Sequence, residues 1–196
     1  RICADNPFLA LDDIRQLIET ITTASDDYIA FVTSNGTPTI KTHYGFWGEA
    51  VTLAALNKIK ELTSKPLYQE HVTNFIYSHP ELFQISYLPI PIEIETEPLR
   101  LTVDTEEDFK LQQQIFAEAV NHKIEFIPEN IVKIIKKHPD YFQIMAEQIK
   151  RSCIDCAVGN CDHMDKSYPG FSLTTNTDRE LKQEAIGEYD NEENRR

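Results

Sequence analysis

The sequence predicts an α/β fold in which strands and helices alternate around a mixed or parallel sheet. Three observations carry this prediction. Short runs rich in β-branched and aromatic residues, such as "YIAFV" (28–32), have the composition of strands. Segments whose apolar residues recur every three or four positions, as in amphipathic helices, lie between these runs. With 196 residues, 41% of them hydrophobic, the chain is long enough to bury one core.

The chain opens with a strand, a helix and a second strand. Residues 1–4 form a short strand candidate that ends at Asp5. The helix that follows begins near Asp12, because negative charge is favourable at a helix N-terminus. The strand over 28–32 comes next. The apolar face of the helix consists of Ile14, Leu17, Ile18 and Ile21.

The middle of the chain begins with the turn signal "SNGTP" (34–38). A glycine-interrupted strand is expected over 43–51, and Thr52 can cap the helix after it. Pro66 opens a further helix that extends to about residue 78. A strand over 82–90 ends in prolines, which cannot donate to a ladder and are typical of an edge.

The last strand of the predicted sheet covers residues 99–103. Thr105, with Asp108 three residues on, forms a capping-box-like start for a helix that continues to about residue 120. Another short helix begins at Pro128. Strands and helices therefore alternate as far as residue 120.

Charge and hydropathy limit the partners of the chain. The formal net charge of −13 argues against nucleic acid, since modules that bind it gather Lys and Arg on one face. No stretch approaches the roughly 20 apolar residues of a membrane span. The N-terminus also lacks the order of basic, apolar and small residues typical of a signal peptide. We therefore expect a cytoplasmic protein that binds neither nucleic acid nor membranes.

Asp5 and Asp104 each follow a strand-like run and precede a helix. Ligands of open α/β sheets bind beyond the carboxyl ends of strands, so neighbouring strands would direct both carboxylates into one crevice. Two carboxylates with no Lys or Arg between them suit Mg²⁺, which takes oxygen ligands and keeps waters and substrate phosphates. The alternative is that Asp104 only interacts with the N-terminus of the following helix.

Four stretches carry a resemblance to a known family. They are "RICADNPFL" (1–9), "GFWGEAVTLAAL" (45–56), "EHVTNFIYSHPELFQI" (70–85) and "LRLTVDTEEDFKLQQQIF" (99–116). In this order they resemble the C-terminal half of the cytidylyltransferases of spore coat polysaccharide biosynthesis, relatives of the Kdo and acylneuraminate cytidylyltransferases. The first looks like the family's strand and Gly-Asp-x-Pro motif, with Ala4 in place of the glycine. The resemblance covers about residues 1–120.

The resemblance implies a glycosyltransferase-A-like (Rossmann-like) mixed sheet with flanking helices. The activity would be that of a nucleotidyltransferase that joins CTP to a sugar acid, giving a CMP-sugar and pyrophosphate. The oligomeric state is left open, with a homodimer as one alternative. Asp5 matches the aspartate of the Gly-Asp-x-Pro motif. Asp104 matches the aspartate of the family's x-Asp-Thr-x-Glu-Asp motif. In such enzymes these two hold Mg²⁺ at the reacting phosphate.

Three further residues are catalytic candidates with two interpretations each. Glu49 matches a family glutamate and could face the sugar pocket, or it could be a strand residue that faces solvent. His71 could contact the sugar carboxylate or phosphate, or it could pack as a hydrogen-bonded residue. Arg100 could bind an anion or pair with a nearby Glu.

One family motif has no counterpart, the triphosphate-binding loop Ala-Arg-x-x-Ser-x-Arg-Leu-Pro-x-Lys. Because it precedes the Gly-Asp-x-Pro motif in the family, it would fall before Arg1. We therefore expect an N-terminally truncated chain that is inactive by itself. The alternative is a non-catalytic interaction domain of the same fold with a zinc-binding tail.

A cysteine cluster lies beyond the resemblance. "CIDCAVGNCDH" places Cys153, Cys156, Cys161 and His163 at a spacing that suits tetrahedral zinc. An iron-sulfur site or ordinary reduced thiols are the alternatives. We expect a helical extension over 121–150, a Cys-rich segment over 151–171 and a disordered acidic tail over 172–196.

Overall fold

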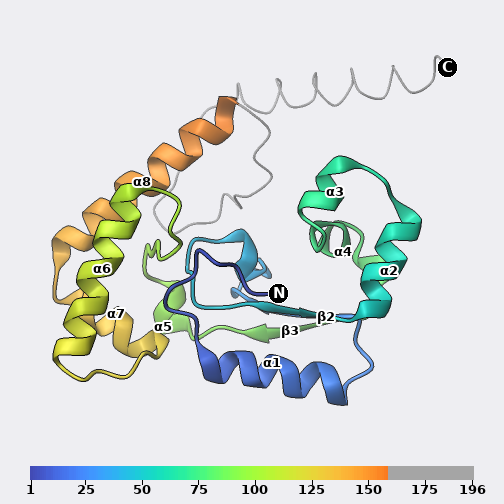
Figure 1. Cartoon of the computed structure of the whole chain (residues 1–196), viewed down its shortest axis with the longest axis horizontal. Helices are drawn as coiled ribbons and strands as arrows, with labels where there is room; N and C mark the ends of the chain where they lie inside the picture. Colours follow the sequence, from blue (N-terminus) through green and yellow to red (C-terminus); the bar gives the residue numbers. More distant parts are fainter. Residues whose placement is uncertain (159–196) are drawn as a thin grey trace.

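The computed structural model describes residues 1–158 (Figure 1). A three-stranded mixed sheet lies at its centre, in the order β2-β1-β3. β1 (Tyr28–Val32) pairs antiparallel with β2 (Glu49–Val51) and parallel with β3 (Ile85–Pro89). The prediction of an α/β fold with a mixed sheet and flanking helices is confirmed.

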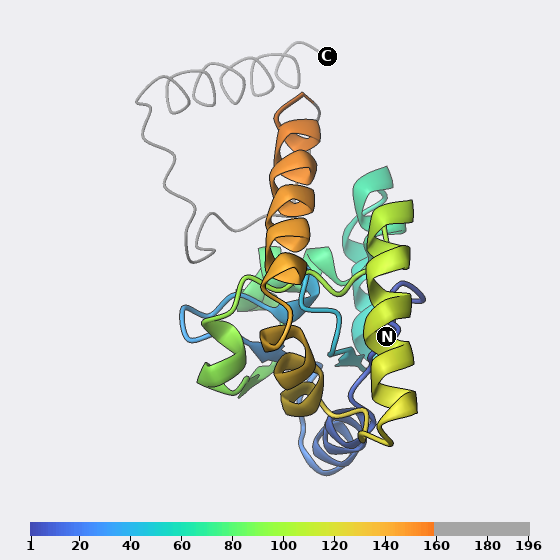
Figure 2. The same ribbon diagram turned by 90° about the vertical axis from the view of Figure 1, so that its left-hand side faces the viewer.

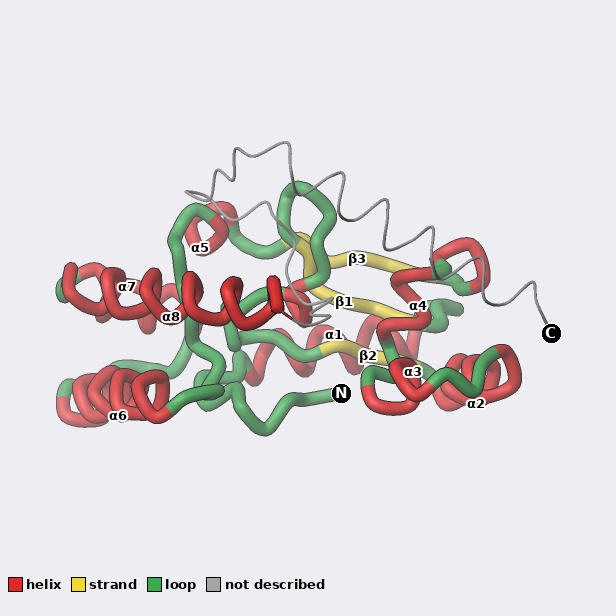
Figure 3. Tube along the Cα trace, turned by 90° about the horizontal axis from the view of Figure 1, so that it is seen from above, coloured by secondary structure: helices red, strands yellow, loops and turns green. Residues whose placement is uncertain are grey.

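Helices flank the sheet at both ends and along its length. Figure 1 places α2, α3 and α4 at one end of the strands, α5 to α8 at the other, and α1 alongside. Figure 3 shows the same separation from above, with α1 beneath the strands. The helical elements are α1 (Leu11–Thr23), η1 (Thr39–Lys41), α2 (Leu53–Leu62), α3 (Pro66–Glu70), α4 (Asn74–Ser78), η2 (Pro80–Leu82), α5 (Ile92–Glu95), α6 (Glu106–Asn121), α7 (Pro128–Lys136) and α8 (Pro139–Val158).

β1 is buried along its whole length, with two hydrophobic clusters on its opposite faces. Ile29 and Phe31 belong to the larger cluster, which includes residues of α1 and of α5 to α8. Tyr28 and Ala30 belong to the smaller cluster with residues of α2 and α4. Side chains alternate between the faces of a strand, so an unbroken apolar run such as this one is typical of a strand covered on both sides.

Two predicted strands are absent. Residues 1–4 and 99–103 have no strand, although each makes isolated backbone hydrogen bonds. The amide of Glu49 donates to the carbonyl of Arg1 (3.1 Å), and the amide of Leu101 donates to that of His43 (2.7 Å). Isolated hydrogen bonds of this kind form no continuous ladder, so composition alone overestimated these strands.

Two other elements differ from their predicted bounds, and one helix differs in the face that it buries. The strand expected over 43–51 is only β2, because Gly45 adopts φ +69° and the carbonyls of His43 and Phe46 accept from other segments than β1. The helix expected from Pro66 to residue 78 is divided into α3 and α4. On α1, Ile14, Leu17 and Ile21 face the core as expected, but Ile18 is 56% exposed.

The C-terminal part of the described chain is helical. α6 and α8 run alongside each other (Figure 2), and Ile131, Ile134 and Ile135 of α7 are buried in the main core. α8 continues to Val158, so it includes Cys153 and Cys156 in its helical backbone. Cys161, His163 and the predicted acidic tail lie outside the described residues. Within residues 1–158, no helix has the length and apolar character of a membrane span.

Candidate functional site

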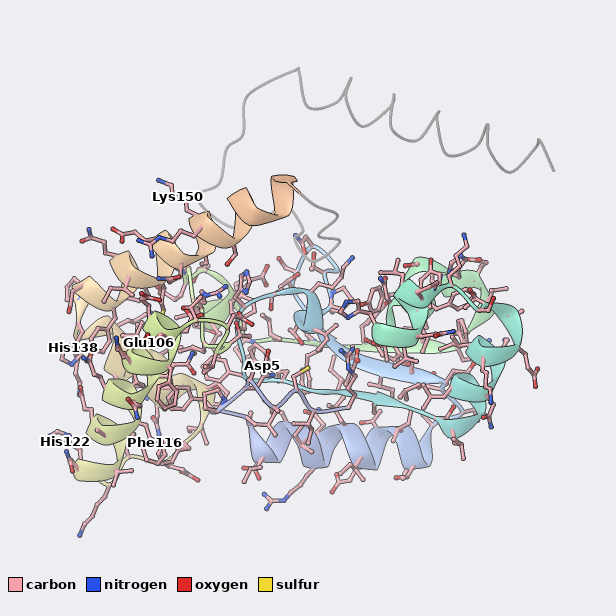
Figure 4. All side chains as sticks on the ribbon, turned by 45° about the horizontal axis from the view of Figure 1, so that its top comes forward. Asp5, Glu106, Phe116, His122, His138 and Lys150 are labelled. Atoms are coloured by element: carbon pink, nitrogen blue, oxygen red, sulfur yellow. The ribbon has the colours of Figure 1, made fainter. Side chains whose placement is uncertain are left out.

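A pocket of about 290 Å³ brings three of the predicted site residues together. Asp5, His71 and Asp104 all line it, although they come from three separate segments of the chain. Figure 4 places Asp5 near the middle of the molecule, between the side that holds α6 and the side that holds α2 to α4. The volume is at the lower end of the roughly 300–1,000 Å³ of ligand pockets, so it suits part of a nucleotide-sugar and not the whole.

Backbone hydrogen bonds hold the two aspartate segments together. The amide of Val103 donates to the carbonyl oxygen of Asp5 over 2.9 Å. Gly45 lies directly beside the second segment, where a Cβ atom would stand 2.5 Å from the carbonyl oxygen of Leu101. The two segments are therefore neighbours, as the prediction of one crevice for both carboxylates required, although neither is a strand.

Asp5 presents an unsatisfied oxygen. Its Oδ1 atom is buried, and no hydrogen-bond partner reaches it in the described part of the chain. Cys3 lines the same pocket, and burial, with the nearby charge of Asp5, raises the pKa of its thiol. A buried carboxylate oxygen without a partner costs free energy unless an ion, a water or a ligand reaches it.

Asp104 is held by two donors on one oxygen. Its Oδ2 accepts from Nη2 of Arg100 (2.8 Å) and from the hydroxyl of Thr102 (2.9 Å). Arg100 therefore stands directly beside one of the two carboxylates. The capping of α6 falls to other residues, because Thr105 and Asp108 form the predicted capping box. The side chain of Asp104 is 48% exposed and faces the pocket.

Arg100 is buried and forms an ion pair, which is one of the two roles expected for it. Its Nε and Nη2 atoms donate to the two carboxylate oxygens of Asp108 over 2.8 and 2.9 Å, so the acid is an aspartate and not the expected Glu. Its Nη1 atom lies 3.0 Å from Nδ1 of His43. Burial raises the pKa of the Asp108 carboxyl, but the hydrogen bonds and charge of Arg100 outweigh it and hold that pKa below its ordinary value.

His71 ends α3, where its amide donates to the carbonyl of Leu67 (2.9 Å). His71 also lines the pocket. Lys41 and His43 line the pocket as well.

Glu49 lies outside the pocket lining and is fully buried. Its Oε1 accepts from Nη1 of Arg1 (2.9 Å) and from the hydroxyl of Thr73 (2.7 Å), and its Oε2 accepts from the hydroxyl of Tyr28. Burial and the Glu49 charge raise the pKa of Tyr28 well above its ordinary value. The interpretation of Glu49 as a solvent-facing strand residue is wrong.

Sequence reasoning missed Lys41, His43 and Thr102 as pocket residues. Lys41 ends η1, and His43 belongs to a segment expected to be strand whose contacts with Leu101 and Arg100 bring it to the site. Thr102 was available as a signal, because it stands two positions before Asp104. A hydroxyl at that spacing can reach the carboxylate, as it does here.

The residues present fit a cation with few protein ligands. No group of three or more His, Cys, Asp or Glu side chains converges in the part of the chain that the structure describes. Mg²⁺ needs only one or two carboxylates, because waters and phosphate oxygens complete its shell. The buried Oδ1 of Asp5 and the carboxylate of Asp104 are such a pair.

The chain has the α/β fold of a cytidylyltransferase. It superposes on a cytidylyltransferase from Leptospira borgpetersenii with a TM-score of 0.56 and 19% identity, over 71% of this chain and 56% of that one. The particular relatives follow from sequence. The chain is 26% identical over 141 residues to the spore coat polysaccharide biosynthesis protein SpsF of Bacillus subtilis, covering 71% of this chain and 55% of SpsF. The predicted resemblance is confirmed, and the chain is a relative of SpsF.

A second relative is an uncharacterized protein of Methanocaldococcus jannaschii. It is 33% identical over 115 residues, which cover 59% of this chain and 44% of that protein. The chain thus spans about half the length of the relatives it matches. No protein-family model matches it.

Proposed function

We propose that the chain supplies the cation-binding side of a Mg²⁺-dependent cytidylyltransferase that transfers CMP from CTP to a sugar acid for surface polysaccharide biosynthesis. The observation that carries the proposal is the meeting of Asp5 and Asp104 in one pocket, with an unsatisfied oxygen on Asp5. The fold of the Leptospira cytidylyltransferase and the relationship to SpsF support the reaction class.

Each side of the pocket has a role in the proposed reaction. The sugar hydroxyl attacks the α-phosphorus of CTP, the bond from that phosphorus to the bridging oxygen breaks, and pyrophosphate leaves. Bound Mg²⁺ would neutralise the charge that develops on the phosphate oxygens. Asp5 and Asp104 would hold the cation, while Lys41 and His71, which line the same pocket, would orient an anionic group of the substrates.

The proposal is tested with protein expressed from its full reading frame. CMP-sugar and pyrophosphate are measured with CTP, Mg²⁺ and a panel of sugar acids, and with neutral sugars in parallel. Asp5→Asn and Asp104→Asn should each lower turnover by about a hundredfold or more, because each removes a carboxylate that would hold Mg²⁺ at the reacting phosphate. The matched control is Asp12→Asn, since that carboxylate is exposed and lies outside the pocket.

Circular dichroism and thermal melts establish that the variants fold. Undiminished transfer by the Asp5→Asn, Asp104→Asn double variant would overturn the assignment of the cation site. Equal turnover in the presence of excess EDTA would overturn the dependence on Mg²⁺. Transfer to neutral sugars alone would replace the sugar acid as the acceptor.

A further inference from the structure

A chain of hydrogen bonds runs from the N-terminus of α6 to the carboxylate of Asp104. Asp108 is at its centre, and its Oδ2 accepts from the backbone amides of Asp104 (3.1 Å) and Thr105 (3.0 Å) as well as from Arg100. The guanidinium of Arg100 is thereby fixed in a plane by two contacts to one carboxylate. Its remaining Nη2 proton donates to Asp104.

Both hydrogen bonds of the Asp104 side chain fall on a single oxygen. Arg100 and Thr102 donate to Oδ2, and no described residue donates to Oδ1. The donors differ in environment, because the side chain of Arg100 is only 1% exposed while Thr102 is partly exposed. A carboxylate anchored through one oxygen keeps a fixed plane and leaves the other oxygen open to the pocket.

We propose that Arg100, with Thr102, is a positioning residue that anchors Asp104 through Oδ2 and reserves Oδ1 for a divalent cation shared with Asp5. The proposal rests on the function proposed above and adds a role that neither the anion-binding nor the simple ion-pair interpretation of Arg100 contained. The guanidinium touches no substrate, and it acts only through the orientation of Asp104. Partners that orient a ligating carboxylate commonly change metal affinity by about 10- to 100-fold.

Replacement of Arg100 by lysine tests whether the charge of the side chain or its hydrogen-bond geometry positions Asp104. Arg100→Lys keeps the positive charge beside Asp104 and Asp108, but a single ammonium cannot make the two parallel contacts to Asp108 and the third to Asp104 together. Thr102→Val removes the second donor from a partly exposed position, so it leaves the buried ion pair intact. Arg15→Lys is the matched control, because Arg15 forms an exposed ion pair with Asp12 away from the pocket.

The probe is Mn²⁺ alone, titrated into the 196-residue chain. Its binding is followed by paramagnetic broadening of the amide NMR signals of Asp5, Val103 and Thr105. Arg100→Lys should weaken the Mn²⁺ affinity by about tenfold or more, and Thr102→Val should weaken it by less in the same direction. Arg15→Lys should leave it unchanged.

Asp5→Asn and Asp104→Asn distinguish failure of this inference from failure of the cation site. Broadening that survives both changes, or that is absent in the unaltered chain, overturns the proposed function and this inference together. Broadening that depends on both aspartates but is the same in Thr102→Val and in folded Arg100→Lys overturns only the positioning role. Thr102→Val decides the matter if Arg100→Lys does not fold, because it acts on the same Oδ2 atom.

Discussion

Arg100 and Asp108 are joined by two parallel hydrogen bonds, and both side chains are almost completely buried. Removal of one partner leaves the other charge in the core without its counter-charge. Asp108→Ala should therefore lower the free energy of unfolding by about 3–5 kcal/mol. Urea unfolding measures this, and Glu107→Ala, an exposed first-turn charge on the same helix, should cost less than about 1 kcal/mol.

The same pair predicts a direction of pH dependence. The pKa of Asp108 is lower in the folded chain than its ordinary value, so its ionised form stabilises the fold above the ordinary value of about 3.9. That stability is lost as the pH falls from there through the folded pKa. Urea midpoints measured across this acid range should fall less steeply in Asp108→Asn, which cannot ionise at this position. Equal slopes would contradict a depressed pKa at Asp108.

Gly45 and Gly36 form a natural pair for a second prediction. Both have positive φ, +69° and +85°, and an alanine at either position pays a similar backbone cost of about 1–2 kcal/mol. Only at Gly45 would the added Cβ lie 2.5 Å from a backbone oxygen, that of Leu101, whereas Gly36 has nothing within 4 Å. Gly45→Ala should therefore lower the melting temperature clearly more than Gly36→Ala. Equal losses would show that the 43–45 loop does not need its close approach to residue 101.

Glu49 gives a third prediction, since three side chains donate to its buried carboxylate. Glu49→Gln keeps the shape but removes the charge, so the pKa of Tyr28 should fall toward its ordinary value. Burial is the larger cause of that raised pKa, and the value should still stay above ordinary. NMR titration of the tyrosine ring measures the change, with Tyr44 as control, whose pKa of about 12 depends on burial and Glu95.

The cysteine cluster supplies a fourth prediction. We propose that Cys153, Cys156, Cys161 and His163 bind one zinc ion, because three thiolates and an imidazole match its tetrahedral preference. Elemental analysis of the purified chain should find zinc, and Cys153→Ser should reduce it strongly. Cys3→Ser is the control, since that thiol is far from the cluster in sequence. Iron with sulfide in the analysis would favour the cluster alternative, and a metal-free preparation would favour ordinary thiols.

Much of the fold could be predicted from local patterns. The apolar run of β1, the Thr52 cap of α2 and the capping box of Thr105 and Asp108 depend on neighbouring residues, and all three are present. The segments over 1–4 and 99–103 are the exceptions. Their composition is that of a strand, but a strand also needs a continuous partner, and no local pattern reports one.

The candidate site was predictable in its acids but not in its contacts. Asp5 and Asp104 were paired from their positions after strand-like runs, and they do share a pocket. The position of Arg100 between Asp104 and Asp108 could not be foreseen. It depends on a guanidinium reaching three partners at once, and one of these, His43, is 57 positions away.

The hydrogen bond from Val103 to Asp5 has a consequence for folding. It joins positions 98 apart, so the two carboxylates meet only after most of the chain between them has been ordered. A cation held by both would therefore bind the folded chain and not the unfolded one, and it would tie down a loop that contains the whole sheet. Such a cation would stabilise the folded domain, and resistance to heat or to proteolysis would rise with the cation concentration even when no nucleotide is present.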